Sequence, residues 1–546
     1  MAHDARRFEN WSREHFISHI RKLEHTLSKP SRITPHTQPA TQFTSTPPRV
    51  PKPFDFSVHP TRKIALKFAY QGEHYNGLAV QKGYTPLPTV EEVLWNALVY
   101  TRLVDPKGGF EGCGWERCGR TDRGVSSAGQ VVSLWIRSCL RDKDASNSSV
   151  KPSLEDSHPV EESDTFNDGY ESDVSGLDDQ FGGLNTWDEA PSNTNLNVPA
   201  KNPKLTDDDE LKYVSCLNGV LPPTIRVLAW TPVEPNFSAR FACQYRHYKY
   251  FFTSRGLDIE AMRNGAKRLV GEHDFRNLCK LDPGKQITNF NRSIHRADIT
   301  ALGLVSDEGG HGPGQVYVFD LVGSAFLYNQ VRHIMAILFL IGTRFEHPSL
   351  VTALLNVDPA NPLPPFHPDD PPLPVVSTKP LYQMASALPL VLWEGGYRDG
   401  ALTWRTDKIS TNKEDADSGS NQANVPSQTQ KDGKDNLFHQ QRAVYERSLI
   451  RAALDEHFLH ATAQHHDRPL EYLPIRPDAP IVEDGVVFGV PLGGGTEKRA
   501  AKYVPVLERE RSEGVEVLNE RWRQTKGTRR VARDTEGDAD VEATNS

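Results

Sequence analysis

A single carboxylate in the stretch Cys118–Ser127 has neighbours suited to chemistry. Asp122 lies between two glycines, with Arg120 two residues before it and Arg123 directly after it. Two arginines beside one Asp favour an ionised carboxylate next to a surface that binds phosphate. Asp and Gly are also common turn residues, so an exposed turn is the alternative interpretation of this loop alone.

The aromatic segment Tyr245–Phe252 is a second candidate, because it mixes rings with basic groups. As a strand it places Arg246 and Tyr248 on one face and Lys249 on the other, and Arg240 comes shortly before it. Rings and basic groups together can stack a base and hold the phosphates of an RNA. The alternative is that these rings are core residues, as aromatic residues on strands usually are.

A third candidate lies in Ala325–Gly342, which is apolar nearly all round and predicts a buried helix that ends at a glycine. Arg332 is the only fixed charge in this segment. Burying a guanidinium without a partner is costly, so a carboxylate should face it. The alternative is an arginine whose long side chain reaches the surface.

The polar stretch Gly271–Lys280 offers further donors. Its Arg276, Asn277 and Lys280 suit contacts with an RNA backbone. A solvated polar loop is an equally good interpretation of the same residues.

Helices and strands on both sides must position these candidates. Alternation of apolar and polar residues over Arg62–Gly72 predicts a half-buried strand. Thr89, with Glu92 three residues later, forms a capping box that begins a helix. The loop with Asp122 follows this helix and runs into an apolar strand over 131–136. Further helices are predicted at 211–221, 258–270 and 441–453, and further strands at 227–230 and 316–322.

The length of 546 residues allows two or three domains with substantial cores. The sequence has no run of about 18 apolar residues and no signal-peptide pattern, so neither a membrane span nor secretion is predicted. Six cysteines in a chain of this length indicate a reducing compartment. No two pairs of them have the spacing of zinc ligands, so no metal site is predicted.

The net charge of −8 conceals an uneven distribution. Residues 141–210 hold 18 Asp and Glu against 5 Lys and Arg, so the rest of the chain carries +5, or +10 without the acidic tail 534–546. A basic core with separate acidic segments fits a polyanionic partner. An ordinary, mildly basic enzyme is an equally good interpretation of the charge alone.

Three segments in order resemble the TruA family of tRNA pseudouridine synthases. Gly119–Val125 resembles the family's catalytic loop, Phe237–Phe241 with the aromatic strand after it resembles a second hallmark, and Phe326–Arg332 resembles a third. The resemblance implies an α+β fold of the pseudouridine synthase type. In this fold two sheet-bearing halves, with mixed or antiparallel sheets, enclose a central RNA-binding cleft.

The resemblance also implies roles for individual residues. Asp122 would be the catalytic carboxylate, Tyr248 would stack on the target base and help to remove its proton, and Arg332 would pair with Asp122 and lower its pKa. Arg120 would occupy the space that a flipped-out nucleotide leaves. The residues expected to bind RNA are Arg120, Arg123, Arg240, Arg246, Lys249, Arg276, Asn277 and Lys280.

The implied reaction converts uridine to pseudouridine in tRNA, an isomerisation that needs no cofactor and no metal. The stretches His273–Lys280 and Met335–Gly342 look like the eukaryotic branch that acts on positions 38 and 39 of the anticodon stem-loop. Two alternatives stay open: a TruA-type synthase with other target uridines in tRNA or another RNA, and a tRNA-binding factor that has lost catalysis. The family precedent also implies a homodimer, without a membrane partner.

The expected organisation follows from these patterns. We expect the cytoplasm and nucleus as the location, since Lys526–Arg533 is basic enough for a weak nuclear signal. The predicted parts are an N-terminal helix and disordered linker (1–60), the first catalytic half (61–235) with a disordered acidic insertion (140–209), the second catalytic half (236–399), a linker (400–440), a C-terminal extension packing on the core (441–533) and the tail (534–546).

Overall fold

The computed structural model describes residues 54–81, 83–140, 210–302, 315–407, 437–466, 488–500 and 502–527. The predicted N-terminal helix, the acidic insertion from residue 141 to 209 and the acidic tail lie outside the described residues. The domain boundaries drawn from the sequence therefore stay predictions.

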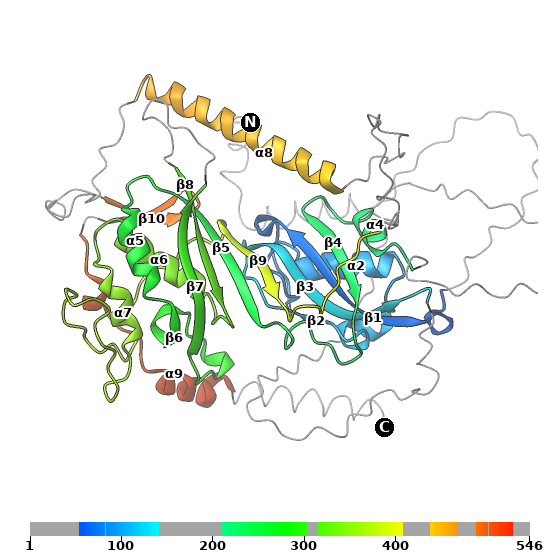
Figure 1. Ribbon diagram of the computed structural model, residues 1–546, viewed down its shortest axis with the longest axis horizontal. Coiled ribbons are helices and arrows are strands. Elements are labelled where there is room, and N and C mark those ends of the chain that lie inside the picture. The colour runs from blue at the N-terminus through cyan, green and yellow to red at the C-terminus, as the bar shows by residue number, and fades with distance from the viewer. Residues whose placement is uncertain are drawn as a thin grey trace, which may run out of the picture. The chain divides into compact units, whose positions relative to one another are not determined.

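One nine-stranded sheet joins the two predicted halves (Figure 1). Its strands run in the order β4-β1-β3-β9-β5-β8-β7-β6, with β2 on the edge of β3. Neighbours are antiparallel except β3 and β9, which are parallel. The predicted α+β fold with a mixed sheet is confirmed, and the two halves share this sheet. The strands are β1 (Thr61–Tyr70), β2 (Glu116–Arg117), β3 (Ser126–Arg137), β4 (Ile225–Pro232), β5 (Tyr245–Thr253), β6 (Gly271–Asp274), β7 (Asn291–Ala301), β8 (Val316–Gly323) and β9 (Leu390–Gly396).

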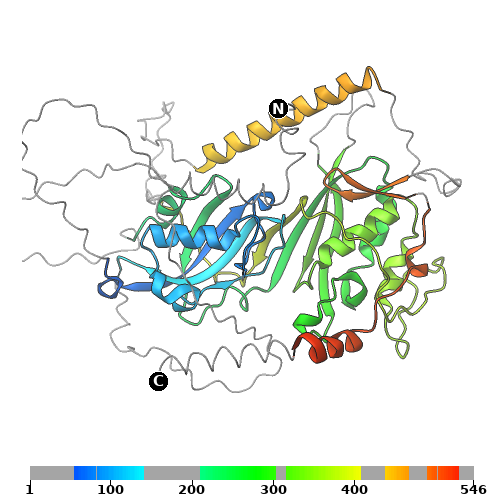
Figure 2. The same ribbon diagram turned by 180° about the vertical axis from the view of Figure 1, so that it is seen from behind.

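In the first half, helix α2 (Val90–Tyr100) covers β1 and β3, as Figure 2 shows from behind. Its capping box forms as predicted, because the Thr89 hydroxyl accepts from the Glu92 N–H while the Glu92 carboxylate accepts from the Thr89 N–H. Leu94 and Leu98 are fully buried against the sheet. The shorter helices of this half are α3 (Gly109–Gly112) and α4 (Tyr213–Asn218).

In the second half, helix α6 (Gln330–Gly342) lies at the centre of the larger core. Every residue of this helix is buried except Arg332, which confirms the predicted buried helix. Phe339 packs edge-on against Tyr250 and Phe252 of β5, so α6 covers that face of the sheet. Helices α5 (Ile259–Lys267) and α7 (Ser349–Leu355) complete this layer.

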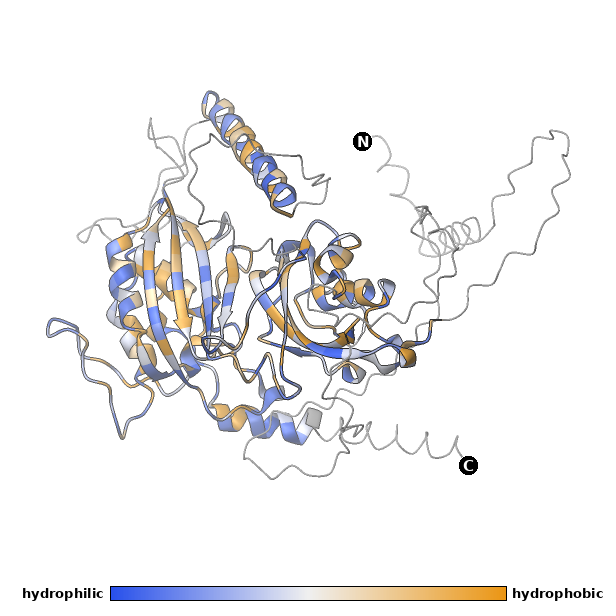
Figure 3. Cartoon of the chain, turned by 45° about the vertical axis from the view of Figure 1, so that its right-hand side comes forward, coloured by the Kyte–Doolittle hydropathy of each residue, from blue (hydrophilic) through white to orange (hydrophobic). Residues whose placement is uncertain are grey.

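The C-terminal extension adds the hairpin β10 (Phe488–Gly493) and β11 (Thr496–Ala500) and the helix α9 (Val515–Trp522). The Glu346 carboxylate accepts hydrogen bonds from the Tyr503 hydroxyl and the Val506 N–H, each over 2.6 Å, and so ties this extension to the second half. Helix α8 (Leu437–Ala463) has no buried residue. Hydrophobic and hydrophilic residues alternate along many strands of the sheet (Figure 3). Of the helices described, none is long and apolar enough to cross a membrane.

Candidate active site

The loop that carries Asp122 connects β2 to β3 and turns sharply at a glycine. The Val125 N–H donates to the Asp122 carbonyl over 3.1 Å, and Gly124 between them has a φ of +83°. This left-handed backbone favours glycine. Gly72 approaches the loop so closely that a Cβ there would lie 2.1 Å from the Val125 carbonyl oxygen. The shape of the loop therefore requires both glycines.

Three hydrogen bonds hold the loop against the neighbouring segments. The hydroxyls of Thr121 and Tyr70 lie 2.6 Å apart and are buried. The Leu78 N–H donates to the Thr121 carbonyl over 3.2 Å, and the Gln130 side-chain amide donates to the Gly119 carbonyl over 2.8 Å. The backbone just before the candidate carboxylate is thus fixed, which restricts where that carboxylate points.

Asp122 itself is half-buried, and within the described part of the chain its carboxylate has no hydrogen-bond or ion-pair partner. Burial raises the pKa of this carboxyl group, and the positive charges of Arg332, Lys285 and Lys280 offset part of the rise. The sequence predicted a lowered pKa. The structure corrects the net direction because desolvation outweighs the nearby cations.

Arg332 lies in the first turn of α6 and reaches the same cleft as Asp122. Its Nε donates to the Ala385 carbonyl over 2.8 Å. Among the described residues no ion pair joins Arg332 to Asp122, so the predicted direct pair does not form. The two charges still act on each other, because Arg332 lowers the pKa of Asp122 and Asp122 raises that of Arg332.

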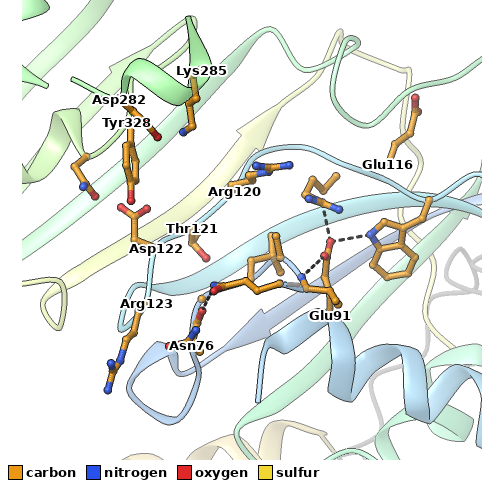
Figure 4. Close-up of a pocket in the computed structure, with 18 of the residues that line it drawn as sticks. Asn76, Glu91, Glu116, Arg120, Thr121, Asp122, Arg123, Asp282, Lys285 and Tyr328 are labelled. Carbon is orange, nitrogen blue, oxygen red and sulfur yellow. Dashed lines mark hydrogen bonds and ion pairs between the residues drawn. The ribbon is translucent and has the colours of Figure 1, made fainter. Parts of the chain in front are cut away.

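A cleft of about 1240 Å³ opens beside Asp122 (Figure 4). Tyr328 lies across from the carboxylate, close to Lys285. The Lys285 ammonium is 4.1 Å from the centre of the Tyr328 ring, and the Lys280 ammonium is 5.1 Å from it. A ring beside two cations gives this wall both a stacking surface and positive charge.

Tyr248 lines a hollow of about 590 Å³ that shares Asp122 and Arg332 with the main cleft. Its ring packs edge-on against Phe326 at 5.0 Å. Burial raises the pKa of the Tyr248 hydroxyl, which is therefore protonated at neutral pH. This favours a stacking role for the ring, because a neutral phenol is a weak base.

Besides Arg246, which lines the hollow, four of the predicted RNA-binding residues line the cleft or the hollow: Arg120, Arg123, Arg240 and Lys280. All four side chains are exposed. Arg120 lies between the two ends of the cleft, whereas Arg123 points away from the carboxylate beside it (Figure 4). These positions leave the residues accessible to an RNA.

Two residues of the second half that were predicted to contact RNA instead make hydrogen bonds within the protein. Asn277 is fully buried, and its amide donates to two backbone carbonyls over 2.9 and 2.6 Å. The prediction that Asn277 touches RNA is therefore wrong. Arg276 donates to the Asp274 carboxylate two residues before it, with a shortest distance of 2.7 Å, so its charge is largely neutralised.

Two further predicted contacts lie on β5. Lys249 forms an ion pair with Asp320 at 3.5 Å, on the sheet face opposite Tyr248, and it lines neither the cleft nor the hollow. Arg246 is on the same face as Tyr248, but its guanidinium donates to four backbone carbonyls, including that of Cys118 at 2.9 Å. Arg246 thus holds the start of the loop that carries Asp122 instead of presenting free donors to RNA.

Several residues of the cleft carry no signal in the sequence that marks them as part of a site. Tyr328 lies inside the segment that resembles the family, but the sequence does not distinguish its ring from the aromatic rings of the core. Lys285 lies in a polar stretch with no periodicity to mark it. Glu91 and Arg117, which meet at 2.7 Å, come from a helix start and a short strand 26 residues apart in the sequence.

Comparison with known proteins identifies similar chains. Residues 266–398 match the tRNA pseudouridine synthase family. The chain is 36% identical over 415 residues to the tRNA pseudouridine(38/39) synthase of Saccharomyces cerevisiae, covering 74% of this chain and 75% of that protein. It is 40% identical over 343 residues to the human protein of the same name, covering 62% of this chain and 56% of that one. A tRNA pseudouridine synthase A of Methanothrix thermoacetophila is 28% identical over 302 residues, covering 55% of this chain and 76% of that protein.

Proposed function

The chain belongs to the TruA family of tRNA pseudouridine synthases, and we propose that it isomerises uridines 38 and 39 in the anticodon stem-loop of tRNA. The observation that carries this proposal is Asp122, a carboxylate without a protein partner among the described residues, in a cleft that also holds Arg332, Lys280 and Lys285. Such a cleft suits a polyanionic substrate and leaves the carboxylate available to react. The similarity to the yeast and human 38/39 synthases supports these two target positions.

The reaction breaks the bond between ribose C1′ and uracil N1, rotates the base and forms a bond between C1′ and C5. The proton on C5 leaves, N1 gains a proton, and no electrons are exchanged with a cofactor. Asp122 must be ionised to act as a nucleophile on the ribose or the base. Burial raises its pKa, and the positive charges of Arg332, Lys285 and Lys280 oppose this rise and so favour the ionised form.

A stacked uridine cannot reach a half-buried carboxylate, so the nucleotide must leave the helix or loop stack. Tyr248 offers a ring for the flipped base in the hollow that it shares with Asp122. Arg120, exposed in the adjoining cleft, would occupy the space that the base leaves. The protonated Tyr248 hydroxyl can donate to the base or to an intermediate.

Tritium release tests this proposal, because isomerisation replaces the hydrogen on C5. The substrates are tRNA labelled at C5 of uridine only at positions 38 and 39, and tRNA labelled only at other uridines. We expect release from the first substrate by the wild type and none by Asp122→Asn. Release only from the second would identify a TruA-type synthase with other targets. Tight binding without release from either would identify a binding factor that has lost catalysis.

We also propose that the chain forms a homodimer and acts in the cytoplasm and nucleus. The family precedent supports the dimer, and the basic stretch Lys526–Arg533 supports nuclear entry. Light scattering on the purified full chain measures its mass, and a monomer at working concentrations would contradict the dimer. Fluorescence imaging of the tagged chain, with and without that stretch, tests the location.

A further inference from the structure

The wall of the cleft contains a second, buried carboxylate, which comes well before Asp122 in the sequence. Glu91, in the first turn of α2, has a side chain that is only 1% exposed. Its oxygens accept hydrogen bonds from the Trp115 indole N–H over 2.8 Å and from the Val80 N–H over 3.1 Å (Figure 4). Burial raises the pKa of Glu91, and the largest opposing influence is the charge of Arg117.

Arg117 supplies the counter-charge with one edge of its guanidinium. Its Nε lies 2.7 Å from Oε1 of Glu91, and its side chain, 24% exposed, lines the cleft. Within the described part of the chain, neither Nη1 nor Nη2 makes a hydrogen bond. A guanidinium held at Nε keeps a pair of donors on its terminal edge, and this edge matches two oxygens of a phosphate.

Charge neutralisation alone does not account for this arrangement. A single ammonium group or a fully buried guanidinium would neutralise Glu91 as well. Instead, the Arg117 guanidinium remains partly in the cleft. Arg120, on the loop that follows β2, is also near enough to lower the pKa of Glu91. Two guanidinium groups on one wall make a local excess of positive charge over the one buried carboxylate.

We propose that Arg117, held by Glu91, binds a backbone phosphate of the substrate RNA. Glu91 is the positioning residue, since its carboxylate fixes the guanidinium plane while the terminal nitrogens contact the phosphodiester. This proposal rests on the proposed function, because the RNA backbone reaches Arg117 only if the target uridine enters the same cleft. Because the phosphate is bound equally before and during the chemical step, the contact should act on binding of the RNA.

The test measures the affinity of the full chain for tRNA at several salt concentrations. Removing Arg117 alone would leave Glu91 buried and unpaired, so the informative variant is Glu91→Gln with Arg117→Gln, which keeps the pair neutral. Loss of one phosphate contact should lower the slope of log affinity against log salt by about 0.7–0.9. Affinity at low salt should fall about tenfold or more, and KM should rise with kcat nearly unchanged.

The matched control is Arg263→Gln, which removes an arginine paired with Glu260 on α5, among residues that do not line the cleft. It should leave the slope unchanged. An unchanged slope in the folded double variant would overturn the phosphate site, and so would wild-type binding without salt dependence. Tritium release by the wild type separates the two proposals. If the wild type releases tritium and the salt slope of the double variant is unchanged, only the phosphate contact is refuted. If the double variant has a lowered salt slope but the wild type releases no tritium, only the proposed reaction is refuted.

Discussion

Replacing the Asp122 carboxylate by its amide should make the protein more stable while removing the proposed activity. In Asp122→Asn the shape is kept, but the charge that burial disfavours is gone. Among the described residues, no hydrogen bond to the carboxylate is lost by this change. We therefore expect a gain of about 1 kcal/mol in the free energy of unfolding at pH 7, the scale for a poorly solvated polar group without a partner. In a protein of this size the midpoint of thermal unfolding should rise by about 1–2 °C.

The pH dependence of this gain follows from the raised pKa. Asp122 titrates above its ordinary value of 3.8 in the folded chain, so the ionised group destabilises folding above the folded-state pKa. This destabilisation vanishes as the pH falls below 3.8. The stability difference between Asp122→Asn and the wild type should thus be constant near neutral pH and disappear in acid.

Thermal and urea unfolding at pH 7 and at pH values down to below 3.8, together with tritium release, form the assay. The control is Asp282→Ala, because the Asp282 carboxylate accepts from the Gly284 N–H over 3.1 Å and also lines the cleft. This variant should lose stability by about 1 kcal/mol. If Asp122→Asn unfolds at a lower temperature than the wild type at pH 7, the carboxylate makes a stabilising contact and the reasoning is refuted.

Three other changes test the surroundings of the site. Tyr70→Phe removes the buried hydroxyl 2.6 Å from that of Thr121; urea unfolding should show a loss of about 1–2 kcal/mol, and single-turnover rates should fall more than tRNA affinity. Asp370→Asn breaks the buried pair with Arg268 at 2.6 Å and should cost about 3–5 kcal/mol at pH 7. The pKa of Asp370 is lowered from 3.8 to about 2, so the difference in free energy of unfolding between Asp370→Asn and the wild type should become smaller as the pH falls through that range. A difference that stays constant with pH would contradict this pairing. Burial lowers the pKa of Lys379 from 10.5 to about 8, so the folded chain releases this proton at a lower pH than the unfolded chain does. The free energy of unfolding of the wild type should therefore rise between pH 8 and 10.5, and Lys379→Met should not show this rise.

Features with local causes were predicted well from the sequence. The capping box of Thr89 and Glu92 depends only on residues three apart, and it begins α2 as expected. The two faces of β5 follow from its period of two, which separates Tyr248 from Lys249. In both cases the deciding interactions lie within one element.

Features decided by distant partners could not be predicted in the same way. Asn277 belongs to a polar stretch, but its amide finds carbonyls 77 and 99 residues further along and is buried. The pKa of Asp122 depends on how much protein surrounds it as well as on Arg332, and the sequence shows only the second influence. In the sequence, Glu91 looks like any acidic residue at the start of a helix. Its ion pair with Arg117 could not be predicted, because it depends on how the sheet positions the strand that carries Arg117.

The position of β9 has a consequence for synthesis of the protein on the ribosome. β9 lies between β3 and β5, and the Ser127 hydroxyl donates to the Leu392 carbonyl over 2.9 Å, so the strand that follows the Asp122 loop gets its parallel neighbour about 270 residues later. At about 5–20 residues per second, a nascent chain waits roughly 15–55 s between making Asp122 and completing Gly396. During that time part of the edge of β3 has no partner strand and can pair wrongly. A messenger truncated before codon 390 would therefore yield a chain that carries every candidate catalytic residue and still lacks the strand that joins its two halves.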